Sequence, residues 1–230
     1  MTLTRKDFCF GHHAPKFDSH IRASIPGYKD GLLPASISLS RRFLQPGTRV
    51  IDIGCSTGHL LASIRKANQA ARPDIQYIGI DIEPSFSMHW ERLRARNLRY
   101  EVADARTYQG YFDLSMVISL FTIQFIRPQD KLPLLQRIYD GMVEGSAMII
   151  AEKTLAVSAR LQDALAYPYY DYKLEQGFSE KDLLDKERSL RGKMTLWTEA
   201  ELKSALRSVG FREIEPIWRN FAFVGLLALK

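Results

Sequence analysis

Short apolar runs alternate with helical patterns through the first two thirds of the chain. The runs at 50–53, 76–81, 98–102, 113–121 and 147–151 predict β-strands, because each is short and ends at polar or turn-forming residues. Strands that alternate with helices in this way favour a mostly parallel, doubly wound α/β sheet.

Between the strands, apolar residues recur three and four positions apart, which predicts amphipathic helices. In the helix expected at 128–143, Leu132, Leu135, Ile138 and Met142 share one face and should point to the core. A helix at the C-terminal end should begin at a capping box of the form Thr-x-x-Glu and end before a glycine. The predicted helices span 17–24, 32–44, 59–67, 85–97, 128–143 and 198–209.

The alternation stops after the fifth strand. Residues 153–197 carry many charges and no strand pattern, which predicts a helical insertion at the carboxyl edge of the sheet, as a lid or an oligomer surface. Two apolar stretches, 211–217 and 219–229, predict a final antiparallel hairpin. With an N-terminal helical cap at residues 1–47, the 230 residues suit a single domain built on a seven-stranded sheet.

The first strand leads into a glycine turn with a distinctive acid. Asp52 lies two residues before Gly54, and Ser56 and Gly58 complete the turn before the next helix. An acid in this place faces a dinucleotide's pyrophosphate poorly, whereas it suits a ligand with an ammonium group. The pattern resembles motif I of the class I methyltransferases, which use S-adenosylmethionine. The alternative is a structural strand-turn-helix that binds nothing.

Two more acids follow at the ends of the next strands. Asp81 ends the second strand about 20 residues past the glycine turn, a place suited to bonding ribose hydroxyls. It could instead cap a helix that starts near Pro84. Asp104 follows the third strand, and in the methyltransferase pattern this position lies beside the adenine amino group.

Composition adds limits on partners and setting. The net charge is +6 and the isoelectric point about 9.3, which permits an anionic substrate, RNA included. Cys9 and Cys55 have no metal or redox spacing, so we expect no metal and a reduced, cytoplasmic protein. The longest apolar run is too short to span a membrane, so we expect no membrane association.

The set of motifs as a whole resembles the carboxy-S-adenosyl-L-methionine synthase family, a branch of the class I methyltransferase fold. That family makes carboxy-S-adenosylmethionine from S-adenosylmethionine and prephenate, for wobble-uridine modification in tRNA. The resemblance implies a homodimer and ligand contacts at Tyr28, Gly54, Asp81 and Asp104. The matching stretches are 24–28, 52–58, 78–81, 121–125, 151–153, 210–211 and 226–230.

Two positions depart from the family pattern. Leu120 stands where the family has an asparagine, and Ala205 stands where an arginine is expected to pair with the product's carboxylate. A buried carboxylate without a cation is costly, unless Arg191 or Arg219 supplies one. We therefore expect an S-adenosylmethionine-dependent methyltransferase that acts on a small-molecule or RNA acceptor. The alternatives are the carboxy-S-adenosyl-L-methionine synthase itself and a non-catalytic protein that binds the cofactor.

No catalytic base is predicted, because methyl transfer from a sulfonium is an in-line displacement that needs mainly positioning. The residues predicted to contact S-adenosyl-L-methionine are Tyr28, Asp52, Gly54, Cys55, Ser56, Gly58, Asp81, Ile82, Asp104, Ala105 and Leu120. The residues predicted to face the acceptor are Gln124, Tyr169 and Arg219. Packing inside the fold is the alternative role for Tyr28 and for the tyrosines of the insertion.

Overall fold

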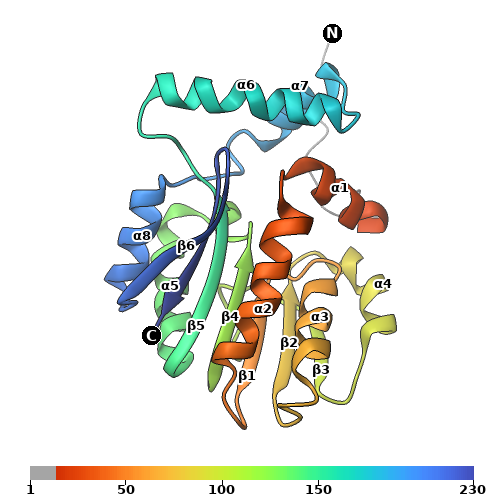
Figure 1. The fold of residues 1–230 in the computed structure, drawn as a ribbon, viewed down its shortest axis with the longest axis vertical. Coiled ribbons are helices and arrows are strands. Elements are labelled where there is room, and N and C mark those ends of the chain that lie inside the picture. The colour runs from red at the N-terminus through yellow and green to blue at the C-terminus, as the bar shows by residue number, and fades with distance from the viewer. Residues whose placement is uncertain (1–13) are drawn as a thin grey trace.

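A seven-stranded sheet forms the centre of the molecule, in the order β3-β2-β1-β4-β5-β7-β6 (Figure 1). The structure is a computed structural model, and it describes residues 14–230. Strands β1 to β5 pair in parallel, whereas β7 is antiparallel to both of its neighbours. The predicted sheet with its C-terminal hairpin is confirmed. The strands are β1 (Arg49–Ile53), β2 (Gln76–Asp81), β3 (Leu98–Val102), β4 (Leu114–Leu120), β5 (Met142–Lys153), β6 (Glu213–Asn220) and β7 (Phe223–Leu229).

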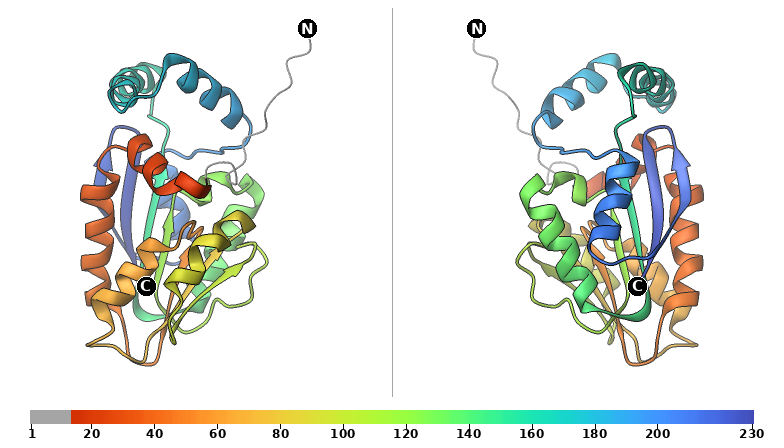
Figure 2. Two further views of the ribbon diagram at one scale, coloured as in Figure 1. Left: turned by 90° about the vertical axis from the view of Figure 1, so that its right-hand side faces the viewer. Right: turned by 90° about the vertical axis from the view of Figure 1, so that its left-hand side faces the viewer.

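Helices cover both faces of the sheet, with α2 and α3 on one face and α5 and α8 on the other (Figure 2). Each interface is an apolar core of branched side chains. The α-helices are α1 (Phe17–Ser24), α2 (Leu33–Phe43), α3 (His59–Asn68), α4 (Ser87–Trp90), α5 (Pro128–Gly141), α6 (Ala159–Glu175), α7 (Glu180–Leu190) and α8 (Glu199–Ser208). Short 3-10 or π turns are η2 (Ala14–Lys16), η3 (Tyr28–Leu32), η4 (Pro84–Phe86), η5 (Glu91–Leu93) and η6 (Ile123–Phe125).

Local sequence signals explain where several helices begin. Thr198 and Glu201 form the predicted capping box of α8, each side chain accepting from the other's backbone N–H. Ser179 and Asp182 form a second capping box, which starts α7 within the insertion. Capping of this kind satisfies amides that have no partner inside the helix.

The inward face of α5 differs from the predicted one. Leu134, Leu135 and Ile138 are buried, but Leu132 is 45% exposed. The buried face is centred on Lys131, whose side chain is covered, and residue 132 lies about 100° around the helix from it. The prediction for Leu132 was wrong because an aliphatic lysine stem completes the apolar face in its place.

The helix predicted at 85–97 was also wrong as one continuous element. The chain instead forms η4, α4 and η5 in succession. Glu83 caps the first turn by accepting from the Ser85 N–H, and the backbone leaves the helix where Ala95 pairs with Leu98. This broken path brings Trp90 to the glycine turn, where its indole N–H donates to the Ser56 carbonyl at 2.7 Å.

The insertion lies across the carboxyl ends of the strands, beside α1 (Figures 1 and 2). It begins with α6, where Ser158 caps the helix by accepting from the Leu161 N–H. Two hydroxyl groups tie α6 to α1, with Tyr169 donating to the Ser24 carbonyl and Tyr172 to the Arg22 carbonyl. None of the helices described in residues 14–230 is long and apolar enough to cross a membrane.

Candidate active site

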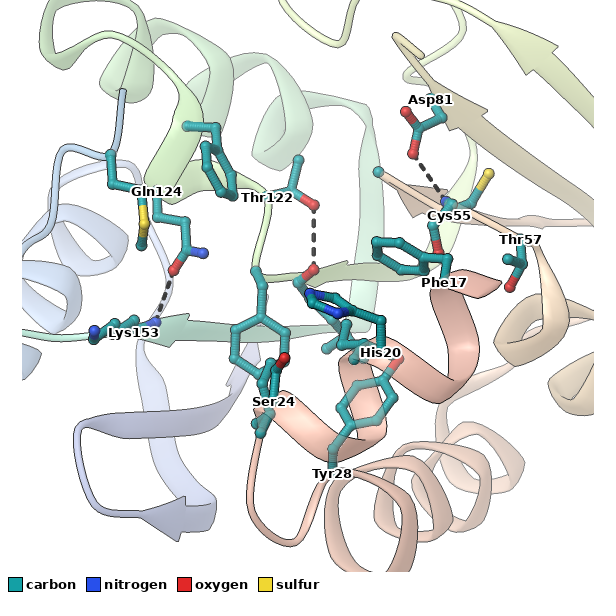
Figure 3. A pocket seen from close by; sticks show the side chains of 18 of the residues that line it. Phe17, His20, Ser24, Tyr28, Cys55, Thr57, Asp81, Thr122, Gln124 and Lys153 are labelled. Carbon is teal, nitrogen blue, oxygen red and sulfur yellow. Dashed lines mark hydrogen bonds between the residues drawn. The ribbon is translucent and has the colours of Figure 1, made fainter. Parts of the chain in front are cut away.

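A cavity of about 570 Å³ lies at the carboxyl edge of the sheet, beneath α1 and the insertion (Figure 3). Its wall comes from the ends of β1, β2, β4 and β5, from α1, and from the facing sides of α6 and α7. This volume is within the range of small-molecule and cofactor sites. In doubly wound sheets, ligands bind at this edge, near the point where the strand order reverses.

The glycine turn is held tightly against the neighbouring strands. The N–H groups of Gly54 and Cys55 donate to the Ile80 carbonyl at 2.8 and 3.0 Å. Gly54 has a φ of +74°, and a Cβ atom there would lie 2.2 Å from Thr122 Oγ1. Glycine is therefore required at 54 both by backbone conformation and by space. Burial raises the pKa of the Cys55 thiol, which agrees with a small turn residue rather than a nucleophile.

Asp81 joins β2 to this turn. Its Oδ2 accepts from the Ser56 N–H and its Oδ1 from the Glu83 N–H, both at 2.9 Å. Each carboxylate oxygen keeps a further lone pair toward the cavity, which Asp81 lines. The side chain that caps the following helix is Glu83, so the alternative role proposed for Asp81 as a helix cap is not observed.

Asp52 is the most deeply buried carboxylate that lines the cavity, at 4% exposed. In residues 14–230 its side chain has neither a hydrogen bond nor an ion-pair partner. Burial, and then repulsion by Asp81, raises the pKa of Asp52 to about 7. A buried acid without a partner is expensive, and a ligand that carries a positive charge would relieve this cost.

Asp104 is already engaged by a basic neighbour. Its carboxylate accepts from Arg106 Nε at 3.0 Å and from Arg106 Nη2 at 2.6 Å. Hydrogen bonding to Arg106 lowers the pKa of Asp104, so it stays ionised. Arg106 also reaches Asp130 on α5, at 3.2 Å. The pair fixes Asp104 at the rim of the cavity, and Arg106 itself lines the wall.

The part of the cavity away from the glycine turn, beneath α6 and α7, is lined by aromatic and basic residues. Tyr28 and Phe121 face each other with ring centres 6.1 Å apart, and Phe121 adopts a φ of +59°. A bulky residue in the left-handed region is uncommon and indicates a locally constrained backbone. Beyond them lie Gln124, Tyr169 and Lys153. The Gln124 side-chain oxygen accepts from the Lys153 N–H at 2.9 Å, which fixes the orientation of the amide (Figure 3).

A buried acid behind this end holds the turn that carries Gln124. Glu152, 5% exposed, accepts from the N–H groups of Ile123 at 3.0 Å and Gln124 at 2.7 Å. Burial raises the pKa of Glu152 to about 8, although these two bonds and nearby Lys131 act in the opposite direction. Glu152 therefore fixes the backbone of η6 from below, without lining the large cavity.

Most of the predicted site residues gather at this cavity. Tyr28, Asp52, Gly54, Cys55, Ser56, Asp81, Ile82, Asp104, Ala105 and Leu120 line it, as do Gln124 and Tyr169. Their individual roles as ligand contacts stay predictions.

Two predicted residues lie outside the cavity wall. Gly58, at a φ of +79°, serves the turn, because a Cβ there would lie 2.5 Å from the Tyr100 ring. Arg219 pairs with Glu199 at the start of α8 and does not line the cavity, so its contact with the acceptor stays a prediction. Position 205 also lies apart from the cavity wall. Ala205 is 8% exposed within the core beneath α8 and does not line the cavity, so its identity says nothing about a carboxylate anchor there.

Other cavity residues gave no clear signal in the sequence. Most come from α1 and from the insertion, whose docking no strand pattern reveals, although capping signals could have placed α6 and α7 themselves. The unpredicted wall residues with chemical groups of interest are Phe17, His20, Ser24, Arg106, Thr122, Lys153, Lys173, Lys186, Glu187 and Met194.

The unpaired acid Asp52 and the close-packed glycine turn fit a ligand such as S-adenosylmethionine, which carries positive charge beside its nucleoside. Comparison with known proteins agrees. Residues 51–147 match a family model described as a methyltransferase domain. Human N-acetylserotonin methyltransferase in complex with SAM superposes with a TM-score of 0.60 at 15% identity, covering 96% of this chain and 56% of that one. A putative methyltransferase of Haloferax volcanii, solved with the Trm112 activator, gives 0.63 at 15% identity and covers 99% of both chains.

The fold and the matched domain define an S-adenosyl-L-methionine-dependent methyltransferase, an enzyme of the transferase class. More similar proteins refine this assignment. The carboxy-S-adenosyl-L-methionine synthase of Nitratiruptor sp. is 31% identical over 220 residues, which is 94% of this chain and 90% of that protein. The protein of the same name from Escherichia coli is 31% identical over 225 residues, 94% of this chain and 88% of that one. The chain belongs to the carboxy-S-adenosyl-L-methionine synthase family.

Proposed function

We propose that this enzyme transfers the methyl group of S-adenosyl-L-methionine to a small molecule held beneath α6 and α7. The observation that carries this proposal is the division of one roofed cavity into an acidic end at the glycine turn and a basic, aromatic end beneath the insertion. The roof formed by α1 and the insertion favours a small acceptor over a folded RNA, which would need an open face.

In this proposal the chain acts mainly by positioning. S-adenosylmethionine, when bound, supplies an electrophilic methyl group on its sulfonium. Asp52 offers a carboxylate to the positive charge, and Asp81 offers two oxygens to the ribose hydroxyls. Gln124 and Tyr169 orient the acceptor, while α1 and α6 exclude water from the space between them. No general base is assigned. A base is needed only where the acceptor must lose a proton during methyl transfer.

The test uses the protein with methyl-labelled S-adenosylmethionine and a fractionated cell extract. Label that appears in a small-molecule fraction supports the proposal, and mass spectrometry then identifies the acceptor. The Asp52→Asn variant is the control, because it keeps the size of the side chain and removes its charge. Label found only in RNA, and absent from that control, would replace the small-molecule acceptor with an RNA.

The similarity to this family supports a second candidate activity, the synthesis of carboxy-S-adenosyl-L-methionine. Its support is the identity of 31% with proteins of that name, together with lysines at the acceptor end that could hold a carboxylate. The protein would then convert S-adenosylmethionine in the presence of prephenate. Mass spectrometry of that mixture separates the two activities, because a carboxylated cofactor differs in mass from a demethylated one.

We also propose a homodimer formed through the insertion. Tyr167 and Leu161 of α6 are 71% and 49% exposed, and Val157, just before this helix, is 80% exposed. Apolar side chains so open to solvent along one segment favour burial against a second copy through a twofold interface. Sedimentation at micromolar concentration tests this homodimer, and a Leu161→Glu variant should shift the protein to monomer.

Cytoplasmic location stays a prediction from the cysteine content.

A further inference from the structure

The helix α1 covers the cavity, yet its own packing is sparse. Six of its eight residues line the cavity, and none of the eight is buried within the described part of the chain. Figure 3 shows Phe17, His20 and Ser24 on the side of α1 that faces the cavity. A helix of eight residues is too short to be stable without packing, and much of the inner face of α1 meets the cavity instead of a core. The helix α1 is therefore an element of low local stability.

The chain is fixed on either side of α1. Ala14 is fully buried, and its carbonyl oxygen lies 2.8 Å from His89 Nε2, at hydrogen-bond distance. At the other end of the helix, Ile25 and Pro26 are buried. Residues 15–24 thus form a flap between two anchored points, and this flap can open without displacing the sheet.

Two tyrosines of α6 hold the C-terminal end of the flap. Tyr172 donates its hydroxyl to the Arg22 carbonyl at 3.2 Å, and Tyr169 donates to the Ser24 carbonyl at 3.1 Å. The Arg22 carbonyl would normally accept from the residue four positions later, but that residue is Pro26, which has no N–H. The Tyr172 hydroxyl therefore supplies a hydrogen bond that the helix cannot make for itself.

The N-terminal half of the flap is bonded to the glycine turn. Asp18 accepts from the Thr57 hydroxyl at 2.6 Å, and its second oxygen lies 3.4 Å from His59 Nε2. All three side chains belong to residues that line the cavity. A ligand bound at the glycine turn would therefore contact the closed flap, and any ligand that binds only the closed form stabilises it.

We propose that residues 15–24 open by local unfolding of α1 to admit the cofactor and then close over it, with Tyr169 and Tyr172 as the latch. This inference rests on the proposed function, since it describes how S-adenosyl-L-methionine enters that site. Each latch bond joins a neutral hydroxyl to a neutral carbonyl, and such a bond makes only a modest net contribution to stability. The latch therefore favours the closed flap while leaving its opening reversible.

Hydrogen exchange of the ligand-free chain tests the flap directly. The amides of 17–25 should exchange faster than those of α2, because opening breaks the helix of the flap and leaves the sheet and its covering helices intact. Tyr172→Phe should raise the exchange rate of α1 about threefold and leave that of α2 unchanged, since it removes one bond of the latch.

Tyr167→Phe is the matched control for this variant. Tyr167 lies on the same helix, is 71% exposed, and its hydroxyl makes no hydrogen bond within residues 14–230. This change should leave the exchange of α1 as it is in the wild type. An equal increase in both variants, or no increase in Tyr172→Phe, overturns the flap.

Binding rates of S-adenosylhomocysteine, the demethylated cofactor, then separate a moving flap from a fixed wall. They are measured by stopped-flow fluorescence of Trp90, which contacts the glycine turn. A flap must open both for entry and for exit, so Tyr172→Phe should speed association and dissociation by the same factor, about threefold, with no change in the dissociation constant. Tyr172 does not line the cavity, so lost ligand contacts cannot produce this pattern.

Two further outcomes keep the flap and the proposed function apart. Faster dissociation alone, or rates equal to those of the wild type, overturns the flap even where S-adenosylhomocysteine binds. Absence of S-adenosylhomocysteine binding in the wild-type chain would instead remove the proposed function, whereas exchange of α1 that depends on Tyr172 in the ligand-free chain would still support the flap.

Discussion

The two ends of the cavity differ in how their polar groups are held. At the cofactor end, Asp81 and Asp104 are fixed by backbone amides and by Arg106. At the acceptor end, Lys153 and Lys173 lie against aromatic rings, with no acid bonded to them among residues 14–230. The first end is preorganised by the sheet, and the second is brought together by a docked insertion. The comparison suggests that the sheet determines which cofactor binds, whereas the insertion determines which acceptor binds.

The sharpest way to break the cofactor end is to fill the glycine turn. A Gly54→Ala change places a Cβ 2.2 Å from Thr122 Oγ1 in a backbone at φ +74°, so Thr122 or the turn must move. We expect a loss of about 2–4 kcal/mol in stability and a loss of measurable cofactor binding. Calorimetric titration with S-adenosylhomocysteine and chemical denaturation measure the two effects.

Gly177→Ala is the matched control for this change. Gly177 also has a positive φ, +87°, but a Cβ there would meet no atom within 4 Å. Only the backbone cost of about 1 kcal/mol should remain, and cofactor affinity should not change. Equal effects of the two changes would mean that the close packing at Gly54 is not what shapes the turn.

Removing the charge of Asp52 should weaken cofactor binding without destabilising the ligand-free protein. Its pKa is raised to about 7, so below that pH the free protein holds a proton that a cationic ligand must expel. Affinity for S-adenosylmethionine should therefore rise with pH between about 5 and 7, by up to about tenfold per unit. Asp52→Asn should weaken binding by about 2–4 kcal/mol and abolish this pH dependence. Calorimetry across that pH range measures both effects.

For the ligand-free protein, we expect the charge of Asp52 to have the opposite effect, because it lowers stability instead of favouring binding. Because the folded state raises the pKa of Asp52 above its ordinary 3.8, folding binds a proton between these values, and this group's contribution to stability falls as pH rises from about 4 to 7. At pH 8 the ligand-free Asp52→Asn protein should thus be more stable than the wild type, by roughly 1–3 kcal/mol. A lower melting temperature for the variant at pH 8 would contradict the view of Asp52 as an unpaired buried charge.

Asp81→Ala tests the neutral contacts of the cofactor end. The change leaves the amides of Ser56 and Glu83 without their acceptor. It also removes the two carboxylate oxygens that would accept hydrogen bonds from the ribose hydroxyls. We expect cofactor affinity to fall by about 1–3 kcal/mol, the cost of unpaired hydroxyls in a closed site. Calorimetry that shows unchanged affinity would remove Asp81 from the ribose contact.

The difference between the two ends also explains what the sequence could and could not predict. Asp52 was identified by its place two residues before the glycine turn, and Asp81 and Asp104 because they come at or just after the end of a strand. Parallel strands bring their carboxyl ends to one edge of the sheet. Lys173 was missed because a lysine on a charged helix normally points to solvent, and Lys153 because it lies just past the strand predicted at 147–151. Their burial depends on how α6 and α7 dock on the domain, and periodicity does not encode docking.

Arg219 and Ala205 also show that sequence position alone does not predict which residues line the cavity. Arg219 was considered as a substitute carboxylate anchor because of its charge, and position 205 was found, by counting back along a helix, to lack the arginine of the family. Position in the sequence gave no account of which helix face meets the cavity, and α8 turns position 205 into the core. The lysines that line the wall come from β5, α6 and α7, and the arginines Arg22, Arg106 and Arg127 line it from other elements.

Arg219→Ala should have the smallest effect, and it sharpens the boundary of the acceptor end. The Arg219 side chain is 52% exposed and pairs with Glu199, whose carboxylate also accepts from Lys203 at 2.7 Å. An exposed pair of this kind contributes about 0–1 kcal/mol, and the pairing with Lys203 remains after the change. We expect the denaturation midpoint to move only slightly, and the affinities for S-adenosylhomocysteine and for small organic anions such as prephenate to stay the same. Loss of anion binding in this variant would extend the acceptor end past the cavity wall to β6 and would support a contact between Arg219 and the acceptor.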